Sequence, residues 1–411
     1  MNDPVTSPLS FADTEAAFAY KTDVELKRAH WLFSLMQYNG LVAFATRFTP
    51  WAIRRHLPIR SILRKTLFPQ FVGGEDLQAT AKVAEKLGRF HVQVILDYGV
   101  EGGDNSDAEY DAACEQFIQV IHYAATQSNI PFMSVKVTGI SRFGLLEKLD
   151  HSVEVNSGSL MKCYEAALQT LSTDERAEWD RVLHRLDRIC SEASQKKVGV
   201  FIDAEDTWIQ DPVDVATLLM MERYNRSAPV VYNTYQLYRH DRLQFLRDCC
   251  EASVQRNFIL GAKLVRGAYM EKERERAQRL DYPSPIQPDK ASTDRDYDAA
   301  IRYCVEHIDR IAMVVASHND QSNLYATRLM DQFGMAHDHP HVHFSQLYGM
   351  SDHITFNLAR AGFSVSKYLP YGPIDEVVHY LMRRAQENSS VGGQTGKELS
   401  LIRKELRRRG L

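Results

Sequence analysis

The amino-acid sequence predicts an α/β protein whose core is a closed barrel of eight parallel strands, each followed by a helix. Three observations support this prediction. Short apolar segments rich in β-branched and aromatic residues recur eight times from residue 89 onward. Segments with helical periodicity separate them. No G-x-G-x-x-G motif follows any of these strands, which argues against the competing doubly wound open sheet.

The elements follow in a regular order. Helices between strands are clearest over residues 211–225 and 321–335, where turn or capping residues bound an apolar pattern. Residues 141–196 are too long for one connection and contain a Ser172/Glu175 capping box, which predicts extra helices. Eight such units predict a (β/α)8 TIM barrel. The predicted strands occupy residues 89–99, 131–140, 197–206, 228–236, 258–269, 310–320, 341–349 and 362–372.

The domain organisation follows from these elements. We expect a helical arm over residues 1–85, a catalytic barrel over residues 86–388 with a helical insert at about 141–196, and a basic tail over residues 389–411.

Composition restricts the function classes. The 411 residues are 44% hydrophobic and 25% charged, as in ordinary globular proteins. A net charge of −4 argues against a nucleic-acid partner. Six cysteines without CxxC spacing are expected to be reduced thiols. The N-terminus lacks a secretory signal pattern, so the expected location is the cytoplasm.

One segment has a marked charge asymmetry. Between Leu26 and Gly74 the sequence contains eight lysines and arginines, interleaved with aromatic residues, and neither aspartate nor glutamate. This composition suits a membrane surface or an acidic partner. The favoured interpretation is a helical arm packed on the body of the protein, with arginine stems covering it. A peripheral contact with the inner face of the cytoplasmic membrane is therefore one of two open interpretations.

Polar side chains lie toward the ends of the predicted strands, where barrel enzymes carry their chemistry. Lys136 and Lys263 are predicted in mid-strand, where charge is costly without a partner. Asp203 and Glu205 can neutralise part of this charge, and the remainder predicts an anionic ligand. A Schiff-base lysine is a rival interpretation. The histidines show no convincing metal-ligand spacing, so no metal is predicted.

A helix predicted from residue 374 places Arg383 and Arg384 outside its apolar stripe. For an arbitrary pair of arginines, a solvent-exposed face is the default interpretation. A functional interpretation requires an anion, because guanidinium groups suit carboxylates and phosphates.

Five ordered motifs resemble those of the flavin-dependent proline dehydrogenases, and the resemblance covers nearly the whole chain. It is strongest to the monofunctional, eukaryotic-like branch. The motifs are "FIDAEDTW" (201–208), "KLVRGAYM" (263–270), "ASHND" (316–320), "QLYGM" (346–350) and "YLPYG…YLMRRAQEN" (368–388).

This resemblance implies a distorted barrel that binds FAD noncovalently. It implies oxidation of L-proline to Δ1-pyrroline-5-carboxylate by hydride transfer to flavin N5, with a membrane quinone as electron acceptor. The oligomeric state stays undetermined. Lys136, Arg383 and Arg384 would bind the substrate carboxylate, with Asp203 orienting them. Further substrate contacts would come from Tyr269, Leu347 and Tyr368. The cofactor contacts implied are Asn233, Gln236, Lys263, Arg266, Gly267, His318 and Glu387.

Two alternatives stay open. Relatives specialised for hydroxyproline tend to carry a small residue in place of Tyr368, so its presence favours proline over hydroxyproline. A barrel lyase that uses a Schiff-base lysine is the alternative from a different class.

Overall fold

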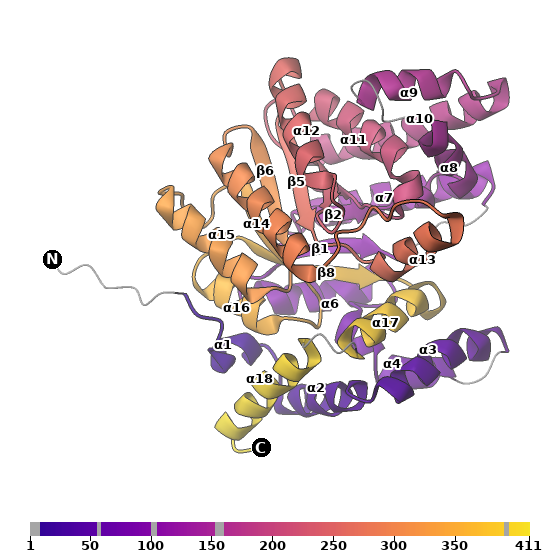
Figure 1. Ribbon diagram of the computed structural model, residues 1–411. Coiled ribbons are helices and arrows are strands. Elements are labelled where there is room, and N and C mark those ends of the chain that lie inside the picture. Colours follow the sequence, from indigo (N-terminus) through magenta and orange to yellow (C-terminus); the bar gives the residue numbers. More distant parts are fainter. Residues whose placement is uncertain (1–8, 56–58, 100–104, 153–159, 390–393) are drawn as a thin grey trace. The chain divides into compact units, whose positions relative to one another are not determined.

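The computed structural model describes residues 9–55, 59–99, 105–152, 160–389 and 394–411. Eight strands form a closed parallel barrel in the order β1 to β8 (Figure 1). The strands are β1 Gln93–Tyr98, β2 Phe132–Val135, β3 Gly199–Ile202, β4 Val231–Gln236, β5 Leu260–Val265, β6 Ile311–Ala316, β7 Val342–Leu347 and β8 Val365–Tyr371.

Helices precede, connect and follow these strands. Those before β1 are α1 Thr14–Phe18, α2 Asp23–Met36, α3 Asn39–Arg54, α4 Ile59–Lys65, α5 Phe68–Phe71 and α6 Leu77–Gly88. Those between β1 and β4 are α7 Asp107–Ala125, η1 Val137–Gly139, α8 Phe143–Ser152, α9 Leu160–Leu168, α10 Thr173–Lys196, η2 Thr207–Ile209 and α11 Gln210–Tyr224. The remainder are α12 Arg242–Arg256, α13 Met270–Leu280, α14 Lys290–Glu306, α15 Asp320–Gln332, α16 Asp352–Arg360, α17 Ile374–Ser389 and α18 Gln394–Arg408.

The predicted barrel is confirmed, since each observed strand lies inside one of the eight predicted ranges. The strands are shorter than predicted, and this shortening corrects one assignment. β2 ends at Val135, and Lys136 is the extended residue that leads into the 3-10 helix η1. Lys136 is therefore not in mid-strand, whereas Lys263 is. Sequence periodicity misplaces such ends because strand and extended loop share one side-chain alternation.

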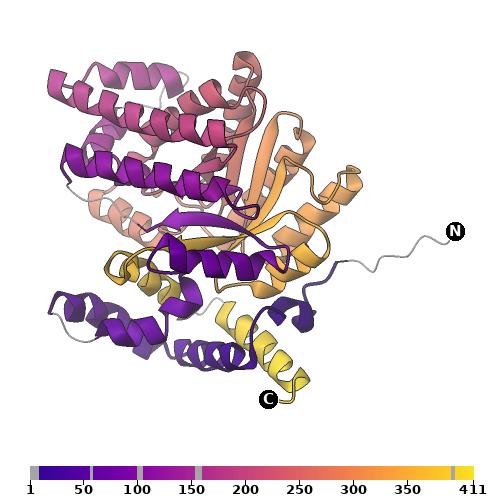
Figure 2. The ribbon, with the colours of Figure 1, turned by 180° about the vertical axis from the view of Figure 1, so that it is seen from behind.

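The chain divides into two compact units. One contains residues 1–99, 318–324 and 344–411, and the other contains residues 100–317 and 325–343. In the first unit, β1 pairs with β8, and β8 pairs with the end of β7. Its apolar core joins helices from both ends of the chain: α2 packs against α18, and α3 packs against α17. Figure 2 shows α18 crossing α2, as Figure 1 does from the opposite side.

The second unit contains β2 to β6 and the helices α8, α9 and α10. The Ser172/Glu175 capping box predicted at the start of α10 is present, with both reciprocal hydrogen bonds formed. An aromatic layer fills the space among the strands near their N-terminal ends. It consists of Phe132, Phe201, Tyr232 and His343. Burial lowers the pKa of His343 to about 3, so this histidine packs as a neutral ring.

None of the helices in the described parts of the chain combines the length and hydropathy that a bilayer-crossing segment requires.

Candidate active site

The predicted site residues divide between the two compact units, and each set is described by itself. The second unit carries Lys136, Asp203, Asn233, Gln236, Lys263, Arg266, Gly267 and Tyr269. The first unit carries His318, Leu347, Tyr368, Arg383, Arg384 and Glu387.

Lys263 and Asp203 form a nearly buried ion pair in the second unit. The ammonium of Lys263 donates to Asp203 Oδ1 at 2.5 Å. It also lies 5.5 Å from the centre of the Phe201 ring, which belongs to the aromatic layer among the strands. Lys263 therefore points into the barrel, as the sequence predicted for a mid-strand lysine with an acidic partner.

Beside this pair, Glu205 is held as a hydrogen-bond acceptor. The hydroxyl of Thr138 lies 2.8 and 2.9 Å from its two carboxylate oxygens. Burial raises the pKa of Glu205 to about 7, against the opposing charge of Lys136 and the hydrogen bonds from Thr138. The site thus contains a carboxyl group that exchanges its proton near neutral pH.

Gln236, the last residue of β4, presents a buried acceptor. Its Nε2 donates to the backbone oxygen of Glu205 at 2.9 Å. Its Oε1 is buried and has no hydrogen-bond partner within the described residues. An unsatisfied buried acceptor is costly, so a ligand that donates an N–H or O–H would stabilise it.

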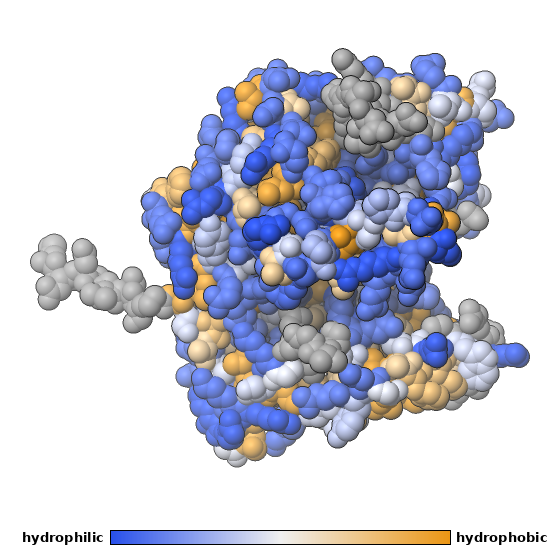
Figure 3. Space-filling view, in the orientation of Figure 1, coloured by the Kyte–Doolittle hydropathy of each residue, from blue (hydrophilic) through white to orange (hydrophobic). Residues whose placement is uncertain are grey.

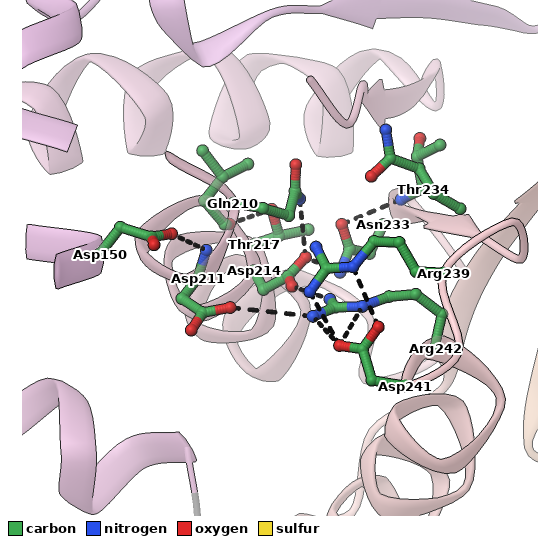
Figure 4. A network of polar contacts seen from close by, with 12 residues as sticks. Asp150, Gln210, Asp211, Asp214, Thr217, Asn233, Thr234, Arg239, Asp241 and Arg242 are labelled. Carbon is green, nitrogen blue, oxygen red and sulfur yellow. Dashed lines mark hydrogen bonds and ion pairs between the residues drawn. The ribbon is translucent and has the colours of Figure 1, made fainter. Parts of the chain in front are cut away.

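Asn233 lies on the opposite face of β4 from Gln236, because side chains alternate along a strand. Its Nδ2 donates to Asp214 Oδ1 at 2.8 Å, and its Oδ1 accepts the backbone N–H of Thr234. Asp214 also accepts from Gln210 on α11 and pairs with Arg242 on α12 (Figure 4). Asn233 therefore anchors β4 to the helix layer, and Gln236 is the better placed of the two for a ligand.

Arg266 and Gly267 follow β5. Arg266 donates to Asp294 at 2.8 Å and to Ser317 Oγ at 2.7 Å, and its guanidinium lies 4.3 Å from the centre of the Tyr297 ring. Gly267 has a φ of 148°, and a Cβ there would approach the Tyr238 ring to 2.5 Å. Only glycine fits this backbone. Tyr269 is half-buried two residues further along the chain.

In the first unit, Tyr368 and Leu347 are neighbours. Tyr368 of β8 is in register with Ile95 of β1 and with Leu347 of β7. The adjacent Lys367 is tied to Asp352 on α16, so alternation turns Tyr368 to the opposite face of the strand, toward the barrel interior. The two predicted substrate contacts thus present one apolar surface.

The two arginines of α17 differ in environment. Arg384 is only 5% exposed, its Nη2 donates to Glu387 Oε1 at 2.5 Å, and its guanidinium lies 4.9 Å from the centre of the Tyr380 ring. Its Nε is buried without a hydrogen-bond partner within the described residues. Arg383 is half-buried. The default interpretation of a solvent-exposed pair is therefore wrong for Arg384. The buried surface of α17 extends beyond its apolar stripe and includes this arginine.

Glu387 is the carboxylate that pairs with Arg384. Burial raises the pKa of Glu387, and the positive charges of Arg384 and Arg383 oppose the increase. The buried Nε of Arg384, which has no hydrogen-bond partner within the described residues, favours an anionic ligand that accepts from it.

His318, which follows β6, is held by the loop after β7. Its Nδ1 lies 2.9 Å from Ser351 Oγ. Ser351 has a left-handed backbone, with φ at 51°, and its backbone N–H donates to Glu398 on α18. The C-terminal helix thereby supports the loop that orients His318.

Sequence reasoning missed two groups. Lys367 is a fully buried lysine in mid-strand, paired with Asp352 at 2.9 Å. The rule that singled out Lys263 would have found it. The sequence indicated Glu205 only as an acid that could neutralise part of the lysine charge, and only its burial beside Thr138 reveals its raised pKa.

The residues present fit a flavin dinucleotide. Gln236 Oε1 has no donor within the described residues, and Arg266 is held by Asp294 beside the exposed backbone of Gly267. The described residues contain no group of three or more histidine, cysteine, aspartate or glutamate side chains arranged to hold a metal ion.

Comparisons with known proteins agree with this description. The sequence matches the family described as "Proline dehydrogenase" over residues 80–397. It is 32% identical to "Hydroxyproline dehydrogenase" of Xenopus laevis, with 98% of this chain and 90% of that protein covered. It is also 32% identical to "Proline dehydrogenase 1, mitochondrial" of Dictyostelium discoideum, with 86% of this chain and 66% of that protein covered.

Solved structures share the fold. The chain superposes on proline utilization A (PutA) from Bdellovibrio bacteriovorus with a TM-score of 0.67 at 19% identity. The superposition covers 93% of this chain and 37% of that protein, so this chain corresponds to about a third of the larger PutA chain.

Proposed function

The chain belongs to the proline dehydrogenase family, and on that premise we propose that it oxidises L-proline to Δ1-pyrroline-5-carboxylate, with FAD as cofactor and a quinone as final electron acceptor. The proposal rests first on one observation. Arg384 is buried and pairs with Glu387, and within the described residues its Nε has no hydrogen-bond partner. The same helix carries Arg383. A small carboxylate ligand satisfies this arrangement.

In the proposed mechanism, Arg383 and Arg384 bind the substrate carboxylate, and Lys136 is predicted to contribute to the same interaction. The apolar surface of Tyr368 and Leu347 packs against the substrate ring, and Tyr269 is predicted to complete this packing. These contacts position the ring carbon next to nitrogen. Positioning of this kind can lower a barrier by roughly 7–11 kcal/mol.

FAD, when bound, would supply the oxidant that accepts a hydride, which carries two electrons, from this carbon. Gln236 would accept a hydrogen bond from the cofactor, and Lys263 would place a positive charge close to it. Asp203 fixes the direction of the Lys263 ammonium. Further cofactor contacts are predicted for Arg266, Gly267, His318 and Glu387. Asn233 anchors β4 to α11 through its hydrogen bond to Asp214.

The substrate amine must be neutral before hydride loss. Release of its proton to water is the simplest route, and the proposal requires no further acid or base from the chain.

Hydroxyproline is the second candidate substrate. It is favoured by the match to the Xenopus laevis protein, which covers almost all of this chain. The buried Tyr368 with Leu347 beside it favours proline, because a phenol at this position would crowd a hydroxyl on the ring. Membership of the proline dehydrogenase family favours redox chemistry over the alternative of a Schiff-base lyase.

Anaerobic titration of the purified protein with L-proline tests the proposal. We expect a yellow protein whose visible absorbance bleaches on addition of L-proline, with Δ1-pyrroline-5-carboxylate identified by mass spectrometry. A protein that neither contains nor takes up flavin would overturn the proposal. So would a bound flavin that L-proline and hydroxyproline both leave oxidised.

A further inference from the structure

Helix α3 has a buried face and an exposed apolar face. Its buried face carries Val42, Thr49 and Ala52 and packs against α17. On the other side, Leu41, Phe44, Phe48 and Trp51 recur at intervals of three and four residues. This spacing places four apolar side chains on one stripe, and three of them, Leu41, Phe44 and Trp51, are exposed with respect to the described residues.

The exposed side chains form a continuous ridge. Phe44 stacks on Phe48 with ring centres 5.4 Å apart, and Phe48 lies 5.2 Å from Trp51. Phe44 is nevertheless 63% exposed, Leu41 48% and Trp51 45%. Figure 3 shows apolar atoms gathered over α3 at the lower right. Scattered single apolar residues need no explanation, but a contiguous exposed patch indicates an interaction site.

The charge around this ridge is positive. Arg60 and Arg64 on α4 are paired with Asp375 and Glu75. Arg47 on α3 and Arg55 directly after it are exposed, and no acidic residue lies between Leu26 and Gly74. The ridge thus combines aromatic side chains with cations and lacks acids of its own.

The combination of aromatic side chains and cations distinguishes between two partners for the ridge, a second copy of this chain and an anionic lipid surface. In a symmetric dimer the ridge would meet its own copy, and the arginines of both copies would come together without a neutralising acid. An anionic lipid surface satisfies both features, because aromatic side chains and arginines are preferred at the membrane interface.

We propose that the ridge formed by Leu41, Phe44, Phe48 and Trp51 docks the chain onto the surface of an anionic lipid bilayer, with α3 lying in the interface. The inference extends the proposed function and rests on it in one respect: a lipid-soluble quinone requires the chain to meet a bilayer.

Co-sedimentation of the full chain with vesicles tests this proposal. Wild-type protein should bind vesicles of phosphatidylcholine and phosphatidylglycerol, and bind phosphatidylcholine vesicles at least tenfold more weakly. The Phe44→Ser/Trp51→Ser variant should lose at least tenfold in binding to the anionic vesicles. Arg47→Gln/Arg55→Gln should weaken binding. It should also make binding less dependent on salt, because salt screens the interaction of these exposed charges with the lipid. The controls are Phe333→Ser and Arg328→Gln, which alter exposed residues of α15 or the turn after it and should bind as wild type.

Oxidation of L-proline with a water-soluble dye separates this inference from the proposed function. The α3 variants should keep full dye-linked activity, because the proposed substrate and cofactor contacts do not include α3. Unchanged vesicle binding by both α3 variants would overturn the docking surface and leave the proposed function standing. Absence of dye-linked activity in wild type would count against the proposed function alone. If sedimentation velocity shows that Phe44→Ser/Trp51→Ser dissociates a dimer while vesicle binding persists, the occupant is a second copy and the bilayer proposal is wrong.

Discussion

The ammonium of Lys263 and the carboxylate of Asp203 lie 2.5 Å apart, with only 8% and 13% of their side chains exposed. Removing one partner takes away this counter-charge while the other charge stays largely buried. We expect Asp203→Ala to lower the free energy of unfolding by about 3–5 kcal/mol, and the Lys263→Met/Asp203→Leu double variant to recover most of it.

Denaturant unfolding of the flavin-free chain measures this difference. Glu85→Ala is the control, because it breaks the exposed ion pair with Arg89 and should cost less than about 1 kcal/mol. Equal effects of Asp203→Ala and Glu85→Ala would contradict the assignment of Lys263 and Asp203 as a buried pair.

Arg384 should contribute to substrate binding more than to stability. Because a charged hydrogen bond is worth about 1.5–3 kcal/mol, Arg384→Ala should raise KM for L-proline by about tenfold to a hundredfold. Arg384→Lys should recover only part of this, since a lysine lacks the planar fork. Steady-state kinetics give KM, and Arg360→Ala, which removes an exposed ion pair with Asp13, should leave it unchanged.

Lys136 and Arg384 are predicted to act on one substrate carboxylate, and a double-mutant cycle tests this. If both bind the same group, the loss in kcat/KM for Lys136→Met/Arg384→Ala should depart from additivity by about 0.5–3 kcal/mol. Strictly additive losses would remove Lys136 from the proposed carboxylate site.

Glu205 should make stability depend on pH near neutrality. Folding raises its pKa from 4.5 to about 7, so the folded state holds this proton more tightly than the unfolded state. The resulting stabilisation is fully present below pH 4.5 and is lost as the pH rises to about 7. As the pH rises across this range, the free energy of unfolding of the wild type should fall by roughly 1–3 kcal/mol relative to that of Glu205→Gln.

Chemical denaturation from about pH 2 to about pH 7 measures the effect, and Glu175→Gln provides a control of opposite sign at the acidic end of this range. The hydrogen bonds from Lys148 and from the backbone of Ser172 lower the pKa of Glu175 to about 2. Its stabilisation is present above pH 4.5 and is lost as the pH falls toward 2. A difference between wild type and Glu205→Gln that stays constant with pH would refute the raised pKa.

Tyr368 should set the preference between proline and hydroxyproline. Replacing the phenol by a small side chain opens space beside Leu347. We expect Tyr368→Ser to lower kcat/KM for L-proline and to raise the ratio of hydroxyproline to proline turnover by roughly 10–200-fold. Tyr371→Phe, in the same strand, should leave this ratio unchanged. An unaltered ratio in Tyr368→Ser would place the specificity elsewhere.

Local pattern was enough to locate the barrel. The alternation of strands such as β5 and β8 with helices was predictable because apolar periodicity indicates which face of each element is buried. That periodicity is contained within a few neighbouring residues. The same pattern placed Lys136 in the middle of a strand over residues 131–140, whereas β2 ends at Val135, where its paired neighbour β3 also ends.

The sequence by itself determined the eight-stranded barrel, the family motifs and the presence of lysines and arginines that need anionic partners. Only the tertiary structure decided that Arg384 is buried, that Lys263 pairs with Asp203, that Lys367 pairs with Asp352, and that Phe44 and Trp51 of α3 are exposed. Periodicity is a local property of the chain. Burial and electrostatic pairing depend on residues far away in sequence, such as the 60 positions that separate Asp203 from Lys263.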